Sequence, residues 1–343
     1  LPEELDIMLI TKSDFESSDS FLAQGGMCTL KDPSDYDSFF EDTLKAGHYE
    51  NDQKSVETMI KSSPDVVKDL VKYGVSFTRD ENGDFVYTRE GAHAHHRILF
   101  HEDITGKEIT SHLLNAVKKL KNVRMYEYTT LLDILCDGSK CCGGIIRWPD
   151  GREEQVEADY VILATGGIGG TYKHSTNFKH LTGDGVEIAR RHNIELKNLD
   201  YVQIHPTTLY SDNKEERSFL ISESVRGEGA RLYDKNMNRF VDELLPRDLL
   251  TQEIYKQMEK DGTDFVWEDL RTIPRDELIS HFPNIIEHCS QAGYDVFHEC
   301  IPIVPAQHYF MGGIKVNHNS KTSMDHLYAV GETACNGVHG KNR

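Results

Sequence analysis

The segment from Tyr160 to Gly167 constrains the fold more than any other part of this sequence. Tyr160 to Ala164 is an apolar run of strand length, and it leads directly into Thr165-Gly166-Gly167, where the backbone can turn tightly or approach a ligand closely. Before it, Tyr126 to Leu163 has the alternation of strands, with a hairpin signal at Asp150-Gly151. Together with the helices expected on either side, this pattern is typical of α/β architecture.

The pattern of apolar residues predicts two helices in the first half of the chain and two further strands. A helix is expected to begin at Ser63-Pro64 and to end at Gly74, because a cap residue, a proline at the first helical position and an apolar stripe follow one another. A second amphipathic helix is expected from Lys107 to Lys121. Short apolar runs predict strands at Leu5–Thr11 and Leu327–Val330. Because the first of these opens the sequence with no strand before it to pair with, we expect the chain to lack a neighbouring segment at its start.

Composition narrows the class of protein. The 343 residues suffice for two cores, and 57 acidic against 38 basic side chains give a net charge of -19, which would repel nucleic acid and anionic lipid. No apolar run approaches the roughly 18 residues of a membrane span, and the first residues lack the features of a signal peptide. We therefore expect a cytoplasmic protein whose partners are neither nucleic acid nor membrane.

Seven cysteines occur without the paired spacing of a zinc site, and we expect reduced thiols. Cys136, Cys141 and Cys142 surround Asp137-Gly138-Ser139, which is typical of a hairpin turn, so ordinary packing is the preferred interpretation. The histidines at 93, 95, 96 and 101 have no carboxylate or cysteine company, and we expect them to be structural and solvent-facing. No metal site is predicted.

A change of composition indicates two domains. From about Asn198 the chain becomes a mixture of helices and loops, and at Tyr309 to Gly313 it returns to glycine-rich turns. We expect a discontinuous Rossmann-like domain formed by residues 1–198 and 310–343, with an α+β capping domain, residues 199–309, inserted in it.

Four glycine clusters occur in a specific order along the chain. They are Ala23-Gln24-Gly25-Gly26, Ala164-Thr165-Gly166-Gly167, Thr182-Gly183-Asp184-Gly185 and Val330-Gly331-Glu332. Each alone is most often only a turn. In this order they resemble the FAD-binding elements of the flavoprotein family that contains fumarate reductase, succinate dehydrogenase and L-aspartate oxidase, and the resemblance runs essentially the whole length.

The resemblance implies FAD as the cofactor and assigns residues to it. The Gln-Gly-Gly loop would lie along the isoalloxazine edge, Thr165 and Gly166 near the adenosine half, and two carboxylates would accept from flavin or ribityl hydroxyls. Asp19 stands where the succinate dehydrogenase branch carries its flavin-linked histidine, so the FAD is expected to be non-covalent. The G-x-G-x-x-G fingerprint that holds the pyrophosphate and the family's C-terminal region are absent from this sequence. The implied cofactor residues are Ser20, Gln24, Gly25, Gly26, Thr165, Gly166, Asp184 and Glu332.

The resemblance also implies a dicarboxylate site. Its motifs are Gln203-Ile204-His205-Pro206-Thr207, Ser222-Glu223, the Ile303–Gly313 stretch with His308, and the last residue, Arg343, which would clamp a carboxylate in bidentate fashion. An isolated His205 would otherwise be interpreted as a satisfied loop histidine. The implied substrate-binding residues are Gln203, His205, Ser222, Glu223, His308 and Arg343.

Arg247 is singled out by local electrostatics. It begins a predicted helix, where the macrodipole disfavours a cation by about 0.3 to 1 kcal/mol. An anionic ligand would resolve the conflict, and so would a salt bridge to Asp248 or Asp242. The resemblance assigns to Arg247 proton transfer at the substrate carbon opposite the flavin.

Thr88-Arg89-Glu90-Gly91-Ala92-His93 indicates the substrate, because it resembles the aspartate oxidase version of this motif. A carboxylate at Glu90 can pair with the α-ammonium of aspartate, whereas succinate and fumarate give it no partner. The implied reaction oxidises L-aspartate to iminoaspartate, with O2 or fumarate as acceptor and quinolinate synthase as the enzyme that consumes the product on the route to NAD. The alternatives are a soluble fumarate reductase or succinate dehydrogenase flavoprotein, and an inactive fragment.

Overall fold

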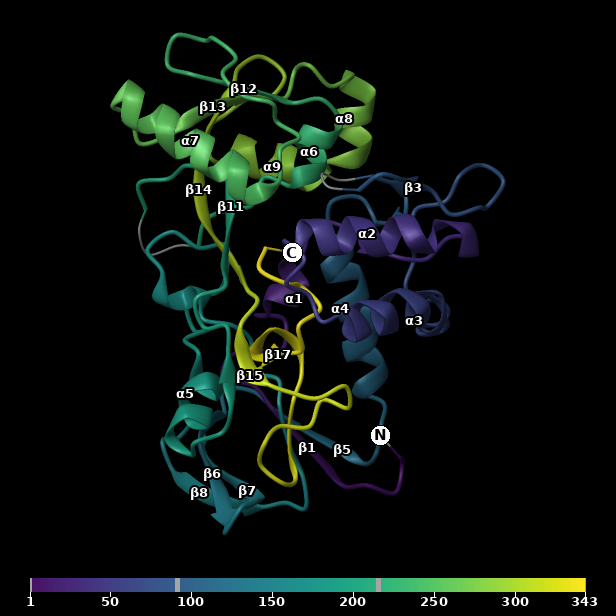
Figure 1. Cartoon of the computed structure of the whole chain (residues 1–343), viewed down its shortest axis with the longest axis vertical. Coiled ribbons are helices and arrows are strands. Elements are labelled where there is room, and N and C mark those ends of the chain that lie inside the picture. The colour runs from purple at the N-terminus through teal and green to yellow at the C-terminus, as the bar shows by residue number, and fades with distance from the viewer. Residues whose placement is uncertain (1, 90–92, 214–216, 343) are drawn as a thin grey trace.

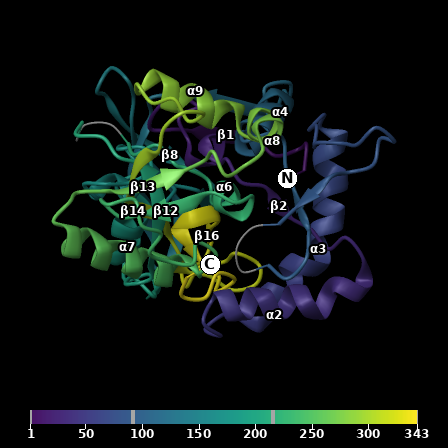
Figure 2. The same ribbon diagram turned by 90° about the horizontal axis from the view of Figure 1, so that it is seen from above.

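The computed structural model describes residues 2–89, 93–213 and 217–342. Its lower part, as drawn in Figure 1, carries small sheets around one helix, its upper part is a cap of helices on a sheet, and helices α2, α3 and α4 lie on one side. Viewed from above in Figure 2, α2 and α3 lie beside the cap helices and not beneath them. Within the described ranges, no helix has the length and apolar character needed to cross a bilayer.

The lower part is built from parallel strand pairs and a hairpin sheet, of which the sequence predicted the strands and the hairpin turns. β1 pairs with β5 and β16 pairs with β9, both in parallel, and β6, β7 and β8 form an antiparallel sheet. The buried residues of this core include Leu163, Ile188, Ile314 and Leu327. The elements are β1 (Ile7–Ile10), β5 (Val123–Tyr126), β6 (Thr130–Asp137), β7 (Lys140–Arg147), β8 (Glu153–Glu157), β9 (Val161–Leu163), α5 (Asp184–Arg191), β10 (Leu196–Lys197), β15 (Gly313–Lys315), β16 (Leu327–Ala329) and β17 (Ala334–Cys335).

The strands expected at Leu5–Thr11, Tyr160–Ala164 and Leu327–Val330 are confirmed as β1, β9 and β16. Both hairpin turns are also confirmed, because Asp137 ends β6 before Lys140 begins β7, and Asp150-Gly151 lies between β7 and β8. The chain therefore shows the α/β architecture predicted for it.

The helices on the side of the molecule pack on a small antiparallel sheet. β4 lies between β2 and β3, and two clusters of buried side chains hold the helices together, one with Phe39, Val56 and Ile60 and the other with Leu70 and Leu99. The elements are α1 (Asp19–Leu22), β2 (Met27–Cys28), η1 (Pro33–Asp35), α2 (Tyr36–Ala46), α3 (Gln53–Lys72), β3 (Tyr87–Thr88), β4 (Ile98–Leu99) and α4 (Thr105–Val117).

The predicted start of the first helix is wrong. α3 begins at Gln53, capped by the side chain of Asp52, and Pro64 lies inside it. A proline has no N–H for the carbonyl four residues earlier, which would leave Ile60 without its helical donor. The Ser63 hydroxyl donates to Ile60 O at 2.8 Å and replaces the missing bond. The helix predicted from Lys107 is confirmed as α4, although it ends at Val117.

The cap is a sheet covered by helices. The strand order is β11-β14-β13-β12, and all neighbouring strands are antiparallel. Its core includes Leu232, Leu250, Ile254 and Ile301, and β11 and β14 extend from the cap into the lower part (Figure 1). Domain boundaries at 198/199 and 309/310 remain a prediction. The elements are β11 (Val202–Leu209), α6 (Glu223–Gly227), β12 (Arg231–Tyr233), α7 (Arg247–Asp261), β13 (Val266–Asp269), α8 (Arg275–His281), α9 (Pro283–Gln291) and β14 (Ile301–Phe310).

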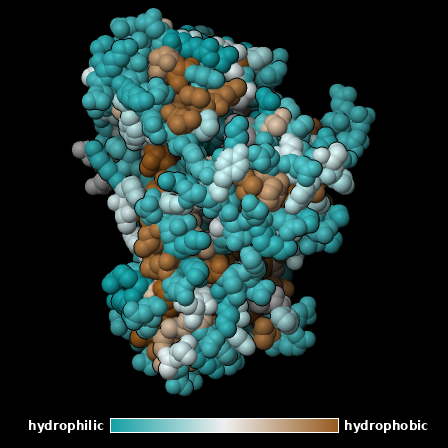
Figure 3. All heavy atoms as spheres, in the orientation of Figure 1, coloured by the Kyte–Doolittle hydropathy of each residue, from teal (hydrophilic) through white to brown (hydrophobic). Residues whose placement is uncertain are grey.

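The surface is mostly hydrophilic on the face drawn in Figure 3, with apolar side chains gathered over part of the cap and in a band below it. The histidine stretch is only partly as expected. His95 and His96 are exposed, but His93 is half-buried, with Nδ1 3.1 Å from Arg97 Nη1. Arg97 itself is fully buried and donates to the carboxylates of Asp35 and Asp42.

Candidate active site

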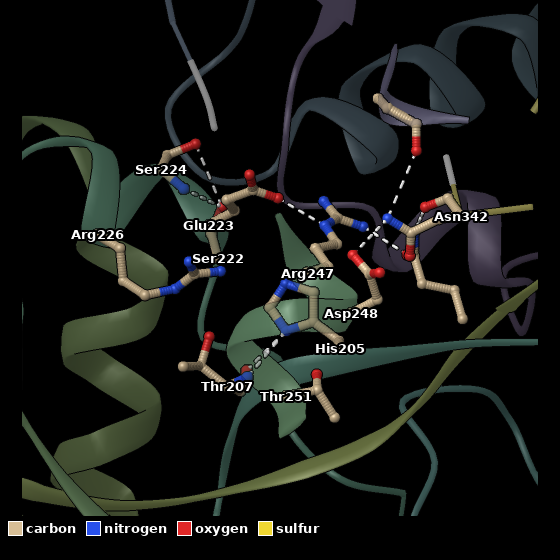
Figure 4. Close-up of polar contacts among 12 residues, drawn as sticks. His205, Thr207, Ser222, Glu223, Ser224, Arg226, Arg247, Asp248, Thr251 and Asn342 are labelled. Carbon is tan, nitrogen blue, oxygen red and sulfur yellow. Dashed lines mark hydrogen bonds and ion pairs between the residues drawn. The ribbon is translucent and has the colours of Figure 1, made fainter. Parts of the chain in front are cut away.

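The candidate site lies where the cap meets the rest of the molecule. Gln203 and His205 lie on β11, His308 lies on the paired strand β14, Glu223 lies on α6 and Arg247 begins α7. Figure 4 labels His205, Glu223 and Arg247 among them. The β11–β14 register shifts between Gln203 and Ile204 and again after His205. The imidazole rings of His205 and His308 lie edge to face, with 5.2 Å between centroids. The structure thus brings together residues that are more than a hundred positions apart in the sequence.

Arg247 is held by two side chains. Its Nε lies 2.5 Å from Glu223 Oε2, and its Nη1 donates to Gln203 Oε1 at 2.7 Å. The Glu223 side chain is 6% exposed and that of Arg247 is 18% exposed. The alternatives of a salt bridge to Asp248 or Asp242 are therefore wrong, because the anion that offsets the helix macrodipole is Glu223. The sequence placed Glu223 against the substrate, and the structure places it against Arg247.

His205 is a buried neutral histidine. Its Nδ1 lies 3.1 Å from Thr207 O and 3.2 Å from Thr207 N, so the backbone satisfies this nitrogen in either tautomer. Its Nε2 is buried and has no hydrogen-bond partner in the described part of the chain. Burial, and then the charge of Arg247, hold the pKa of His205 well below its usual range. An unpaired buried ring nitrogen is what a ligand oxygen would satisfy, so the interpretation of His205 as a satisfied loop histidine is not supported.

His308 has the same electrostatic character. Burial, and then Arg247, lower its pKa to about 3. Its Nδ1 lies 2.7 Å from Thr176 Oγ1, and Asn177 Nδ2 donates to its carbonyl at 2.9 Å. Thr176 was missed by sequence reasoning, because a single threonine in a loop forms no motif. Both histidines are thus neutral hydrogen-bonding groups beside one cation.

A cavity of about 480 Å³ adjoins these groups. Arg247, His308 and Gln203 line one part of it, and the chain from Gly26 to Cys28 lines another. This volume is in the usual range for a cofactor or small-ligand pocket. Ser222 lies outside it, in a smaller pocket shared with Gln24, Gly25 and Gly26, where its hydroxyl accepts from Ser224 N as the cap of α6. The glycine loop therefore borders both spaces.

Several buried polar atoms around this loop fit a polar cofactor. Gln24 Oε1 and Asp19 Oδ2 are buried and lack partners among the residues described. Burial raises the pKa of Asp19 to about 6 and that of Glu332 to about 8, so the Glu332 carboxyl can donate as well as accept near neutral pH. Glu332 Oε1 accepts from Phe310 N at 2.8 Å. A flavin, whose ring edge and side chain carry both donors and acceptors, fits these groups.

The other predicted cofactor residues are placed as follows. Ser20 is exposed on α1, Thr165 Oγ1 donates to Thr333 Oγ1 at 3.0 Å, and Gly166 has a φ of 71°. Asp184 begins α5 and pairs with Lys12 Nζ at 2.7 Å, so its carboxylate already has a cation. The roles assigned to these residues remain predictions. Glu90 and Arg343 lie outside the described residues.

The comparisons agree with this geometry. The model of the FAD binding domain family matches residues 2–343. L-Aspartate oxidase from Clostridium perfringens is 48% identical over 343 residues, which cover 100% of this chain and 78% of that protein. L-Aspartate oxidase from Clostridium acetobutylicum is 43% identical over 100% of this chain and 79% of its own length. The solved structure of a single-residue variant of E. coli quinol fumarate reductase FrdA has a TM-score of 0.91 at 29% identity, over 99% of this chain and 62% of that one.

The fold and the site together define an FAD-dependent oxidoreductase, and FAD is its cofactor. Within that class, the chain belongs to the L-aspartate oxidase family. It spans about four fifths of the two Clostridium relatives and 62% of the fumarate reductase chain. The family resemblance drawn from the ordered glycine clusters is confirmed.

Proposed function

We propose that this chain carries the catalytic site for the oxidation of L-aspartate to iminoaspartate, with O2 or fumarate as the final acceptor. The observation that carries the proposal is the group formed by the buried histidines His205 and His308 and the Arg247–Glu223 ion pair, of which Arg247 and His308 line the cavity. A small dicarboxylate needs hydrogen-bond donors for four oxygens and a positive field, and the two imidazoles and the Arg247 guanidinium supply part of both. FAD, when bound, supplies the hydride acceptor.

Each residue of the site has a separate role in this reaction. His205, with the hydrogen on Nε2 and Nδ1 accepting from Thr207 N, donates to one substrate carboxylate, and Ser222 assists it. His308 and Arg343 hold the other carboxylate, and Glu90 pairs with the α-ammonium. As Cα–H leaves as hydride, the α-ammonium must release one proton to give the imine. Arg247 would face the reacting carbon, and Glu223, in contact with Arg247, would take that proton. Most of the catalysis on the protein side is then orientation of Cα–H toward the flavin.

The instability of the product indicates what kind of enzyme must act next. Iminoaspartate hydrolyses readily in water, so an enzyme that consumes it promptly is required, and we propose quinolinate synthase on the route to NAD. A reducing compartment such as the cytoplasm is also proposed, supported by all seven cysteines, which lie within the described residues and are free thiols.

The experiment is a peroxide assay with L-aspartate, with and without fumarate. L-Aspartate-dependent peroxide that falls when fumarate is added supports the proposal. The second candidate, a fumarate reductase, is favoured by the likeness to FrdA and uses the same histidines and Arg247. Glu90→Gln separates the two: it should abolish most L-aspartate oxidation and leave fumarate reduction with an artificial donor largely intact. Unchanged L-aspartate turnover in Glu90→Gln would contradict the aspartate assignment.

A further inference from the structure

The hairpin formed by β6 and β7 carries a thiol that the proposed function does not use. Of the seven cysteines, all within the described residues, Cys136 alone is exposed. Cys141, its partner across the hairpin, is buried in the core of the lower part. Ordinary packing, the interpretation preferred from the sequence, therefore explains Cys141 but not Cys136. Cys136 does not line the cavity of the candidate active site either.

Cys136 belongs to a group of a thiol, an imidazole and a carboxylate. Its Sγ lies 3.5 Å from His192 Nδ1, and His192 Nε2 lies 2.7 Å from Asp133 Oδ1. His192 directly follows α5, which lies near β6 in the lower part of the molecule (Figure 1). The three side chains therefore come from two elements, the strand β6 and the end of α5.

The sequence alone does not bring Asp133 and Cys136 to one side. They are three residues apart on β6, and residues at this spacing point to opposite faces of a regular strand. The pairing of β6 with β7 is irregular just before Asp133 and again just before Cys136. Such irregularities bend and twist a strand locally, which allows both side chains to reach the same imidazole.

The hydrogen bonds fix the tautomer of His192. A carboxylate only accepts, so Nε2 carries the hydrogen that Asp133 receives, and neutral His192 has its lone pair at Nδ1. That lone pair faces the sulfur of Cys136, whose S–H can donate to it. Asp133 is itself held, because its Oδ2 accepts from Arg191 Nη1 at 3.1 Å and its Oδ1 accepts from Ile134 N at 2.9 Å. A nucleophile, its general base and the group that orients the base have this order in activated cysteines.

The resting form of this group is the thiol. Burial, and then Cys141 and Cys142, raise the pKa of Cys136. The thiolate is the nucleophile, so the proton must leave during an attack, and His192 Nδ1 is in contact to take it. The ordinary explanation is that the contact only fixes the hairpin to the end of α5. That explanation predicts that loss of the imidazole changes stability and not the reactivity of Cys136.

We propose that Cys136 is a modification site for hydrogen peroxide, with His192 as its general base and Asp133 as the positioning residue. The sulfur attacks one peroxide oxygen while its proton passes to His192 Nδ1, the O–O bond breaks, and the leaving hydroxide takes that proton and becomes water. The sulfur is oxidised by two electrons and the peroxide is reduced by two, so thiol and peroxide give sulfenic acid and water. Sulfenic acid is a reversible form of cysteine.

The inference does not rest on the proposed function. Oxidation with O2 would release hydrogen peroxide close to this site, but peroxide added from outside tests the site equally well. The two proposals can therefore fail separately.

The test exposes the reduced, FAD-loaded protein to hydrogen peroxide, with dimedone to trap sulfenic acid and peptide mass spectrometry to measure it at each cysteine. A positioned general base is usually worth about 10²-fold or more, so Cys136 should be labelled at least about tenfold faster than the half-buried Cys28 and Cys142. His192→Gln should slow the labelling of Cys136 at least about tenfold for the same reason. Asp133→Asn should cause a smaller fall, because its amide oxygen can still accept from His192 Nε2.

Two further measurements separate a general base from a structural contact. His318→Gln is the matched control, because His318 forms a histidine–aspartate pair with Asp52 elsewhere on the surface. It should leave the labelling of Cys136 unchanged. In His192→Gly, added imidazole should restore part of the lost rate, because it can take the proton that His192 would take. A role of His192 in stability alone does not predict that rescue.

The outcomes are distinct. Labelling of Cys136 no faster than that of Cys28 and Cys142 would overturn the modification site. Labelling at the wild-type rate in His192→Gln, or an equal fall in His318→Gln, would overturn the role of the imidazole. If His192→Gln fails to fold, His192→Gly with and without imidazole and Asp133→Asn decide the question by the same criteria. Failure of the wild-type enzyme to oxidise L-aspartate would overturn the proposed function and leave the labelling by added peroxide unaffected.

Discussion

Arg247 Nε and Glu223 Oε2 lie 2.5 Å apart in a nearly buried ion pair that joins the start of α7 to α6. A charged pair at this burial is stable only while both partners are present, because either charge alone would be left poorly solvated. The same pair places a carboxylate directly behind the cation that faces the reaction cavity. It therefore links the stability of the cap to the chemistry proposed for it.

Glu223→Gln should remove this proton-accepting partner and leave the shape of the site almost unchanged. We expect kcat for L-aspartate to fall by about 10²-fold or more, the usual scale for loss of a general acid–base group. KM should change little, because Glu223 is engaged by Arg247 and does not hold the substrate. Steady-state kinetics would measure kcat and KM separately and so show whether only kcat falls. Glu223→Asp, which keeps the charge, should recover part of the rate, and a wild-type kcat in Glu223→Gln would contradict the role.

Ser63→Ala should destabilise the protein although it deletes a single oxygen. The Ser63 hydroxyl donates to Ile60 O, and it also accepts from Leu30 N at 2.9 Å. Its loss leaves buried backbone groups without partners, at a cost of about 1 to 3 kcal/mol. The free energy of unfolding in urea would measure this. In a Pro64→Ala background the backbone N–H can again bond Ile60 O, so the cost of Ser63→Ala should be smaller there, and an equal cost would contradict the explanation.

Sequence reasoning succeeded where the signal is local. An apolar run of strand length that ends in a glycine turn determines β9, and an Asp-Gly pair between alternating residues determines the hairpin before it. It failed at α3 because a proline after a serine also occurs inside a helix when the serine hydroxyl takes over the missing bond. The replacement of the backbone hydrogen bond by the serine hydroxyl depends on the rotamer of one side chain. Hydrophobic periodicity does not reveal that rotamer.

In the candidate site, too, the sequence predicted some features and only the fold revealed others. The sequence identified the electrostatic conflict at Arg247, but the resolving anion, Glu223, is 24 positions away on another helix and became visible only in the fold. Arg97 is a second example. It lies among histidines that were expected to face solvent, yet it is fully buried because Asp35 and Asp42 from another part of the chain approach it. Ion pairs between distant segments cannot be predicted from the spacing of residues in a motif or from composition.

Glu268→Gln should change how the stability of the protein depends on pH. Glu268 is fully buried on β13, and burial raises its pKa to about 8 from an ordinary value of 4.5. An acid with a raised folded pKa contributes stability that is complete below 4.5 and is lost as the pH rises to 8. The amide has no such dependence. The stability of Glu268→Gln relative to wild type should therefore rise through this window, by at most roughly 1.4 kcal/mol per pH unit.

Thermal unfolding between pH 4.5 and 9 would measure the effect of Glu268→Gln. The control is Glu253→Gln, the same substitution at a surface glutamate that pairs with Lys256. The absolute stability of Glu268→Gln is not the criterion, because the substitution also changes a buried carboxyl group that interacts electrostatically with the buried Arg226. A difference from wild type that stays constant across the window would contradict an ionisable Glu268 that is neutral in the folded protein.

Gly26→Ala should destabilise the apoprotein as well as weaken FAD binding. The family resemblance assigns Gly26 to the flavin, but the structure gives it a second constraint. A Cβ at this position would stand 2.2 Å from Leu99 O and 2.3 Å from Ile98 Cγ2, because β2 pairs with β4 directly after it. Overpacking against backbone costs about 1 to 3 kcal/mol. Urea unfolding of the apoprotein should show that loss.

Gly151→Asn is the matched control, since its turn has open space and asparagine tolerates its φ of 85°. A Gly26→Ala apoprotein as stable as wild type, with only FAD affinity reduced, would restrict Gly26 to cofactor binding.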